Sequence, residues 1–100
     1  MKKLLILIAA LVSFQSSALT VSDCQYITEH SYRIMYERQY GATLSNMVRT
    51  YSYSEKKDMM LKIVYISFEQ TRWYSESMRH KASSEFASQF EVACMAKVGV

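Results

Sequence analysis

Proline is absent from this chain, and Gly41 is the only glycine before Gly99. Small β proteins join their strands by tight turns that depend on glycine, proline and asparagine, so this chain has little of the turn chemistry that hairpins need. Helix interiors tolerate nearly every other residue type. The sequence therefore predicts an all-α protein.

Capping patterns and apolar spacing predict the helices of the first half. Ser22 and Gln25 have the spacing of a capping box, and we expect the helix that they open to reach about Tyr40, where Gly41 ends it. Its apolar face consists of Cys24, Ile27, Ser31, Ile34 and Met35. A short helix capped by Thr43 follows, with helical spacing at Leu44, Met47, Val48 and Tyr51.

Two further helices are expected in the second half. Ser52 and Glu55 repeat the capping-box spacing and open a helix to about Gln70, whose wide apolar arc favours a central place in the fold. That arc contains Met59, Leu61, Ile63, Val64, Ile66 and Phe68. Ser75 then caps a last helix from Glu76 to about Lys97, whose inner face contains Ala82, Phe86, Phe90, Ala93 and Cys94.

Two cysteines, Cys24 and Cys94, stand near the two ends of the predicted domain. The alternatives to an intramolecular disulfide are a metal pair, a redox centre and a disulfide-linked dimer. Metal sites need three or four ligands, and a thioredoxin-type centre needs two cysteines separated by two residues. We therefore expect a disulfide that joins the first helix to the last. The predicted fold is a small antiparallel bundle of three long helices and one short one, closed by this bond.

Residues 1–18 have the order of a cleavable secretory signal peptide. Lys2 and Lys3 precede an apolar run at residues 4–12, and small residues at Ser16 and Ala18 suit signal peptidase. The run has nine residues, whereas a membrane-spanning helix takes roughly twenty. The alternative is a buried N-terminal helix. We expect cleavage after Ala18, one helical domain at residues 19–100, a periplasmic or secreted location, and no stable membrane insertion.

The charge balance argues against a nucleic-acid partner. Without Lys2 and Lys3, ten of the twelve Lys and Arg residues remain against nine Asp and Glu, a net charge of +1. Phosphate backbones are bound by concentrated basic surfaces. The longest basic run, Lys56 and Lys57, is flanked by Glu55 and Asp58, so we interpret it as a solvated face.

No catalytic, cofactor-binding or metal-binding residue is predicted. His30 and His80 belong to no hydrolase, zinc or phosphate-binding motif, and we expect both to lie at the surface. Met59 and Met60 are candidate thioether ligands for copper. Adjacent helical residues diverge by about 100 degrees, which favours core packing instead. The sequence thus predicts a protein that is not an enzyme.

Aromatic residues are the candidates for protein binding. Tyr32, Tyr36 and Tyr40 are spaced by four residues and form a ridge beside the core face of the first helix. The alternative is that this tyrosine ridge packs against the short second helix and completes the core. Trp73, beside Tyr74, is the second aromatic candidate. Arg38 falls on the inward face, where we expect a structural salt bridge with Glu69 or Glu85.

Several short motifs together resemble an uncharacterised family of small exported helical proteins of phages and proteobacteria. The motifs are ERQYG at 37–41, LSNM at 44–47 and FEQTRW at 68–73, followed by Glu85, Phe86 and Cys94. The resemblance implies a cysteine at each end and two conserved turns, and transfers no mechanism. The chain departs from the pattern at Thr71, where proline is usual. A phage origin would favour lysis control or superinfection exclusion.

Two functions are compatible with these features. The first is a non-enzymatic, periplasmic or secreted binding module that modulates another envelope protein, supported by the surplus of aromatic residues. The alternative is a periplasmic stress chaperone for unfolded clients, supported by small size and a high apolar fraction. Two histidines and a net charge near balance give the chaperone no special pH trigger. A membrane-active peptide is disfavoured by the balanced charge of the last helix.

Overall fold

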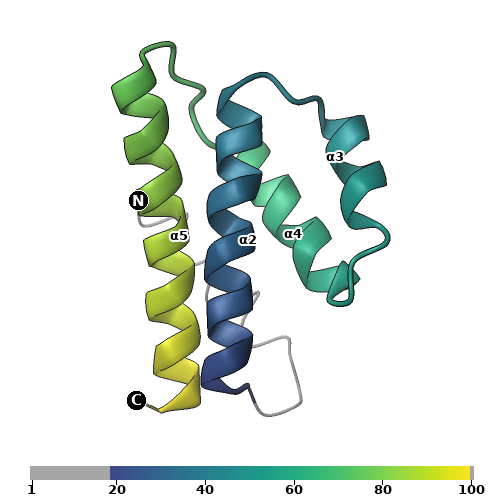
Figure 1. Ribbon diagram of the computed structural model, residues 1–100, viewed down its shortest axis with the longest axis vertical. Coiled ribbons are helices and arrows are strands. Elements are labelled where there is room, and N and C mark those ends of the chain that lie inside the picture. Colours follow the sequence, from purple (N-terminus) through teal and green to yellow (C-terminus); the bar gives the residue numbers. More distant parts are fainter. Residues whose placement is uncertain (1–18, 100) are drawn as a thin grey trace.

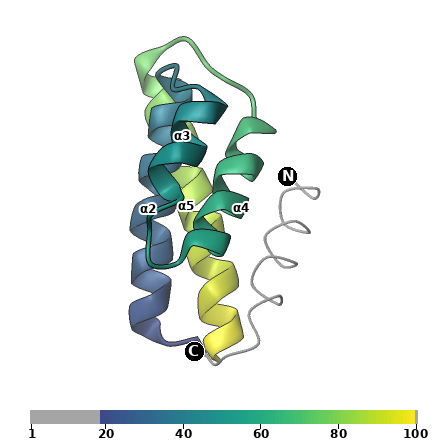
Figure 2. The same cartoon turned by 90° about the vertical axis from the view of Figure 1, so that its right-hand side faces the viewer.

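The computed structural model describes residues 19–99, which form four helices and no strand. They are α2 (Val21–Gln39), α3 (Leu44–Tyr51), α4 (Lys57–Phe68) and α5 (Glu76–Val98). The two long helices α2 and α5 lie side by side and antiparallel (Figure 1). α4 packs on α2, and α3 packs on α4 (Figure 2). The all-α prediction is confirmed. The predicted signal peptide lies outside the described residues.

The helix start near the N-terminus differs from the prediction by two residues. Thr20 is the N-cap of α2, because its hydroxyl accepts from the Asp23 N–H at 3.1 Å while the Asp23 carboxylate accepts from the Thr20 N–H at 2.9 Å. Ser22 and Gln25 therefore do not form the predicted capping box. An aspartate in the first turn also interacts favourably with the helix dipole, which a glutamine cannot do.

The start of α4 was also predicted wrongly. Ser52 donates its hydroxyl to the carbonyl of Val48 and so belongs to the end of α3. Its oxygen therefore caps no new helix, and α4 begins only at Lys57, with Lys56 as an N-cap that makes no side-chain hydrogen bond. The third helix is shorter than expected, with 12 residues. Its apolar arc is wide because the helix packs against two neighbours, α2 and α3.

Three other helix boundaries agree with the prediction. Thr43 and Ser75 are the N-caps of α3 and α5, and their hydroxyls accept from Asn46 and Met78 backbone N–H groups. Gly41 ends α2 with φ +97°. The Gly41 and Ala42 N–H groups donate to the carbonyls of Arg38 and Glu37, which together is the Schellman arrangement.

The disulfide joins the two long helices at the end of the molecule where α2 begins and α5 ends. Cys24 and Cys94 are bonded, with their Cα atoms 5.6 Å apart, and both are fully buried. This confirms the predicted pairing and the antiparallel packing that brings the cysteines together. Met59 and Met60 are 4% and 0% exposed, so both belong to the core. The other large core side chains are Ile27, Ile34, Met35, Met47, Tyr51, Ile63, Val64, Ile66, Phe86 and Phe90.

No helix between residues 19 and 99 is long and apolar enough to cross a bilayer.

Candidate protein-binding surface

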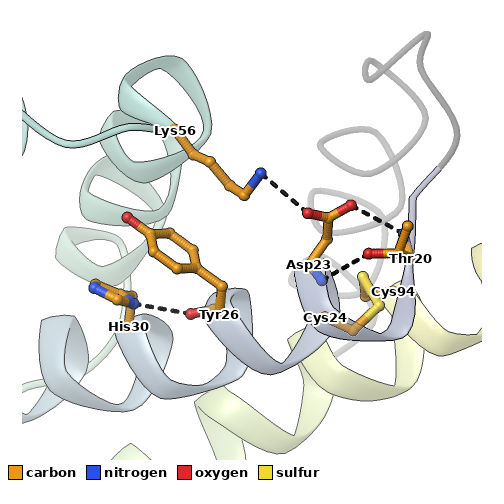
Figure 3. A network of polar contacts seen from close by, with 7 residues as sticks. All are labelled: Thr20, Asp23, Cys24, Tyr26, His30, Lys56 and Cys94. Atoms are coloured by element: carbon orange, nitrogen blue, oxygen red, sulfur yellow. Dashed lines mark hydrogen bonds and ion pairs between the residues drawn. A yellow bond between two sulfur atoms is a disulfide. The ribbon is translucent and has the colours of Figure 1, made fainter.

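The disulfide end carries a polar network that ties the start of α2 to the segment before α4 (Figure 3). The Lys56 ammonium lies 3.1 Å from the Asp23 carboxylate. The pKa of Asp23 is lowered first by the hydrogen bond from the Thr20 backbone and then by Lys56. Nearby, His30 stacks on Tyr26, with ring centroids 4.1 Å apart. Thr20, Asp23 and Lys56 are paired with one another, and His30 Nδ1 lies 2.9 Å from the Tyr26 carbonyl, which is typical of a structural role.

The tyrosine ridge faces α5. Tyr32 hydrogen-bonds through its hydroxyl to Nδ1 of His80 at 3.1 Å, and the Tyr36 ring centroid lies 5.7 Å from that of His80. Tyr36 and Tyr40 are in ring contact at 4.6 Å. Tyr32 and Tyr36 are half-buried. The ridge contacts are thus with α5, whereas the short second helix, α3, packs on α4.

The last ridge residue, Tyr40, belongs to a second group of exposed aromatic side chains. Tyr40 is 41% exposed, Trp73 40% and Tyr74 81%. The Arg79 guanidinium lies 4.5 Å above the Tyr40 ring and donates from Nε to the Trp73 carbonyl at 2.8 Å. The Arg72 guanidinium lies 5.8 Å from the Tyr74 ring. We call these five residues the aromatic tip. It lies where α2 ends and α5 begins, opposite the disulfide.

Gln39 holds the aromatic tip in place, and sequence reasoning missed it. Its side chain is fully buried. The amide nitrogen donates to the Thr71 carbonyl at 2.8 Å, and the amide oxygen accepts from the Trp73 N–H at 2.7 Å. One side chain thus serves as both donor and acceptor for the segment that crosses the end of α2. The only sequence signal was the pair of short motifs at 37–41 and 68–73, which the structure brings into contact.

Arg38 does not form the predicted salt bridge. Its Nη2 donates to the Gln70 carbonyl at 3.3 Å, and its guanidinium lies 4.6 Å from the Phe68 ring centroid. Glu85 instead lies 4.0 Å from Lys81 on the same helix. The pKa of Arg38 is lowered first by burial and then by the positive charge of Arg72. A carbonyl and an aromatic face therefore replace the carboxylate that we expected.

A cavity of about 310 Å³ opens beside Trp73, between the segment that follows α4 and the first half of α5. The buried side chains of Met35 and Phe86 line it, together with the exposed Lys81 and Glu85. Because its lining combines apolar side chains with an ion pair, the cavity extends the aromatic tip as a mixed surface. Among the described residues, no group of three or more His, Cys, Asp or Glu side chains is placed to hold a metal ion.

Comparison of the chain with models of protein families, with curated proteins and with solved structures finds no match.

Proposed function

We propose that this chain is an exported, non-enzymatic binding module that holds another protein of the cell envelope with its aromatic tip. One observation carries the proposal: Tyr40, Trp73 and Tyr74 are exposed together, and arginines lie against two of them. Tyrosine, tryptophan and arginine are the residue types that dominate binding energy at protein interfaces.

The rigidity of the aromatic tip supports a binding role. Both backbone polar groups of Trp73 are hydrogen-bonded. The Trp73 N–H donates to the Gln39 side chain, and the Trp73 carbonyl accepts from the Arg79 side chain. A surface that is ordered before association loses less conformational entropy when a partner binds. Export is supported by the N-terminal sequence and by the disulfide, since such bonds persist in oxidising compartments.

A site-specific crosslink tests the proposal in the cell. A photoreactive benzoyl-phenylalanine in place of Trp73 should give one product of discrete mass on illumination. The same group in place of Tyr53, which is 88% exposed in the connection between α3 and α4, is the control and should not give it. Tyr74→Ala should reduce the yield at position 73 and change the free energy of unfolding by less than about 0.5 kcal/mol.

Two results would contradict the proposal. One is the same set of products from positions 53 and 73, which would indicate random collisions. The other is a yield at position 73 that is insensitive to Tyr74→Ala. A ladder of many client masses from both positions would favour the periplasmic chaperone instead.

A further inference from the structure

Arg38 and Arg72, which we call the arginine pair, are held by the same crossing of the chain beside the aromatic tip. Arg38 donates from Nη2 to the Gln70 carbonyl at 3.3 Å, and Arg72 donates from Nε to the Gln39 carbonyl at 3.2 Å. Gly41 lies so close to Arg72 that a Cβ atom there would be 3.1 Å from its Nη2. The Arg72 guanidinium thus packs against the backbone at the end of α2.

In the described part of the chain, the arginine pair has no negative partner of its own. Within residues 19–99, no carboxylate lies within ion-pair distance of either guanidinium. The Glu37 carboxylate accepts from the Tyr51 hydroxyl, and the charge of Glu76 acts on Tyr36. Two like charges, one of them half-buried, are held together at an energetic cost that a bound anion would offset.

The arginine pair also has unused hydrogen-bond donors. Nε of Arg38 is buried and has no acceptor among residues 19–99. The two terminal amino groups of the exposed Arg72 have no hydrogen-bond acceptor within the part of the chain that the structure describes. Because the Nε of Arg72 is already engaged, the edge with both terminal amino groups is the one left for a two-pronged contact with a carboxylate.

We infer that the partner presents an acidic peptide segment, whose carboxylates bind Arg72 and Arg38 while a neighbouring apolar side chain packs on Trp73 and Tyr74. This inference rests on the proposed function and names the chemistry of the partner. A lipid head group is the weaker occupant. Electrostatic attachment to a membrane takes a cluster of roughly four to eight basic residues, whereas the arginine pair has two.

A titration followed by nuclear magnetic resonance tests the inference. The probe is an acetylated peptide of alternating glycine and glutamate, added to the exported, disulfide-bonded, nitrogen-15-labelled protein. We expect saturable shifts of the Nε–H signals of Arg38 and Arg72 and of the Trp73 indole signal. The same peptide with glutamine in place of glutamate should produce no saturable shift. Arg72→Gln should weaken binding about tenfold.

Arg49→Gln is the matched control, because it removes the same charge from an exposed position on α3. It should change the affinity less than twofold. An equal loss in both variants would show diffuse attraction and overturn the inference, as would the absence of saturable shifts. Binding to vesicles that contain phosphatidylglycerol, lost in Arg72→Gln while the peptide has no effect, would assign the arginine pair to lipid instead.

These outcomes can be told apart from failure of the proposed function. If the acidic peptide does not bind but the crosslink at position 73 still depends on Tyr74, the aromatic tip binds a partner of different chemistry. If the crosslink fails as well, both proposals fall.

Discussion

At the scale of single residues, Gln39 shows how one buried amide determines the shape of a surface 34 residues away in sequence. The segment after α4 has no helix or strand in which to satisfy its backbone groups. Gln39 satisfies the Thr71 carbonyl and the Trp73 N–H at once. A buried polar group is tolerated when both its donor and its acceptor are paired, and here that pairing positions Trp73.

We predict that Gln39→Leu lowers the free energy of unfolding by about 1–3 kcal/mol, because it leaves the Thr71 carbonyl and the Trp73 N–H without a partner while keeping side-chain volume. Urea unfolding measures this change. Gln25→Leu is the control, since Gln25 is exposed on the same helix, and should stay within about 0.5 kcal/mol. Equal effects of the two substitutions would show that the Gln39 amide does not hold the segment.

At the scale of elements, a buried tyrosine attaches α3 to α2. Tyr51 is 5% exposed and donates its hydroxyl to the Glu37 carboxylate at 3.3 Å. Burial first, and then the negative charge of Glu37, raises the pKa of Tyr51 above its ordinary value of 10.0. The neutral phenol is therefore the form that the packed helices accept.

This raised pKa predicts an alkaline loss of stability. An unfolded Tyr51 ionises near pH 10.0 while the folded one stays neutral. The contribution of Tyr51 is therefore complete below that pH and falls as the pH rises above it. Tyr51→Phe should lower the free energy of unfolding at neutral pH by about 1 kcal/mol. Above pH 10.0, the free energy of unfolding should fall less in this variant than in the unsubstituted protein.

Urea unfolding on either side of that pH measures both effects. Tyr53→Phe is the control, because Tyr53 is exposed in the connection that follows α3, and should leave the pH dependence as in the unsubstituted protein. A Tyr51→Phe protein whose alkaline loss equals that of the Tyr53→Phe protein would contradict the assignment.

At the scale of the whole molecule, the disulfide lies where α2 begins and α5 ends, and the aromatic tip lies where α2 ends and α5 begins. These are the two opposite ends of the α2–α5 pair (Figure 1). One end is covalently closed, and the other is joined by Gln39, Arg72 and Arg79. A domain of this size has a small hydrophobic core. A covalent link between its two longest helices therefore contributes a large fraction of the free energy of unfolding.

We predict that the double variant Cys24→Ser, Cys94→Ser is less stable than the oxidised protein by up to about 4 kcal/mol, since the bond closes a loop across 70 positions. Thermal unfolding monitored by circular dichroism measures this. Reductant should lower the melting temperature of the unsubstituted protein toward that of the double variant and leave the double variant unchanged. Equal melting temperatures with and without reductant would contradict a stabilising role.

The sequence by itself determined the features that depend on neighbouring residues. The caps Thr43 and Ser75, the stop at Gly41 and the disulfide pairing were predicted correctly. The caps and the helix stop each depend on residues within a few positions of one another. The disulfide is a long-range contact, but the chain has two cysteines and therefore one possible intramolecular pairing. Local spacing gave the wrong N-cap where two capping patterns competed, Ser22 with Gln25 and Thr20 with Asp23. The charge of Asp23 and its ion pair with Lys56 favour the second pattern, and residue spacing alone does not include them.

Only the tertiary structure decided what the polar and aromatic residues contact. The tyrosine ridge faces α5, Arg38 meets a carbonyl and an aromatic ring, and Gln39 reaches residues 71 and 73. These partners lie 30 or more positions away in sequence. Helical periodicity gives the direction of a side chain but does not identify the element that it contacts. The aromatic tip therefore exists only once α2 and α5 are packed, because residues from both helices and from the segment between α4 and α5 must meet to form it.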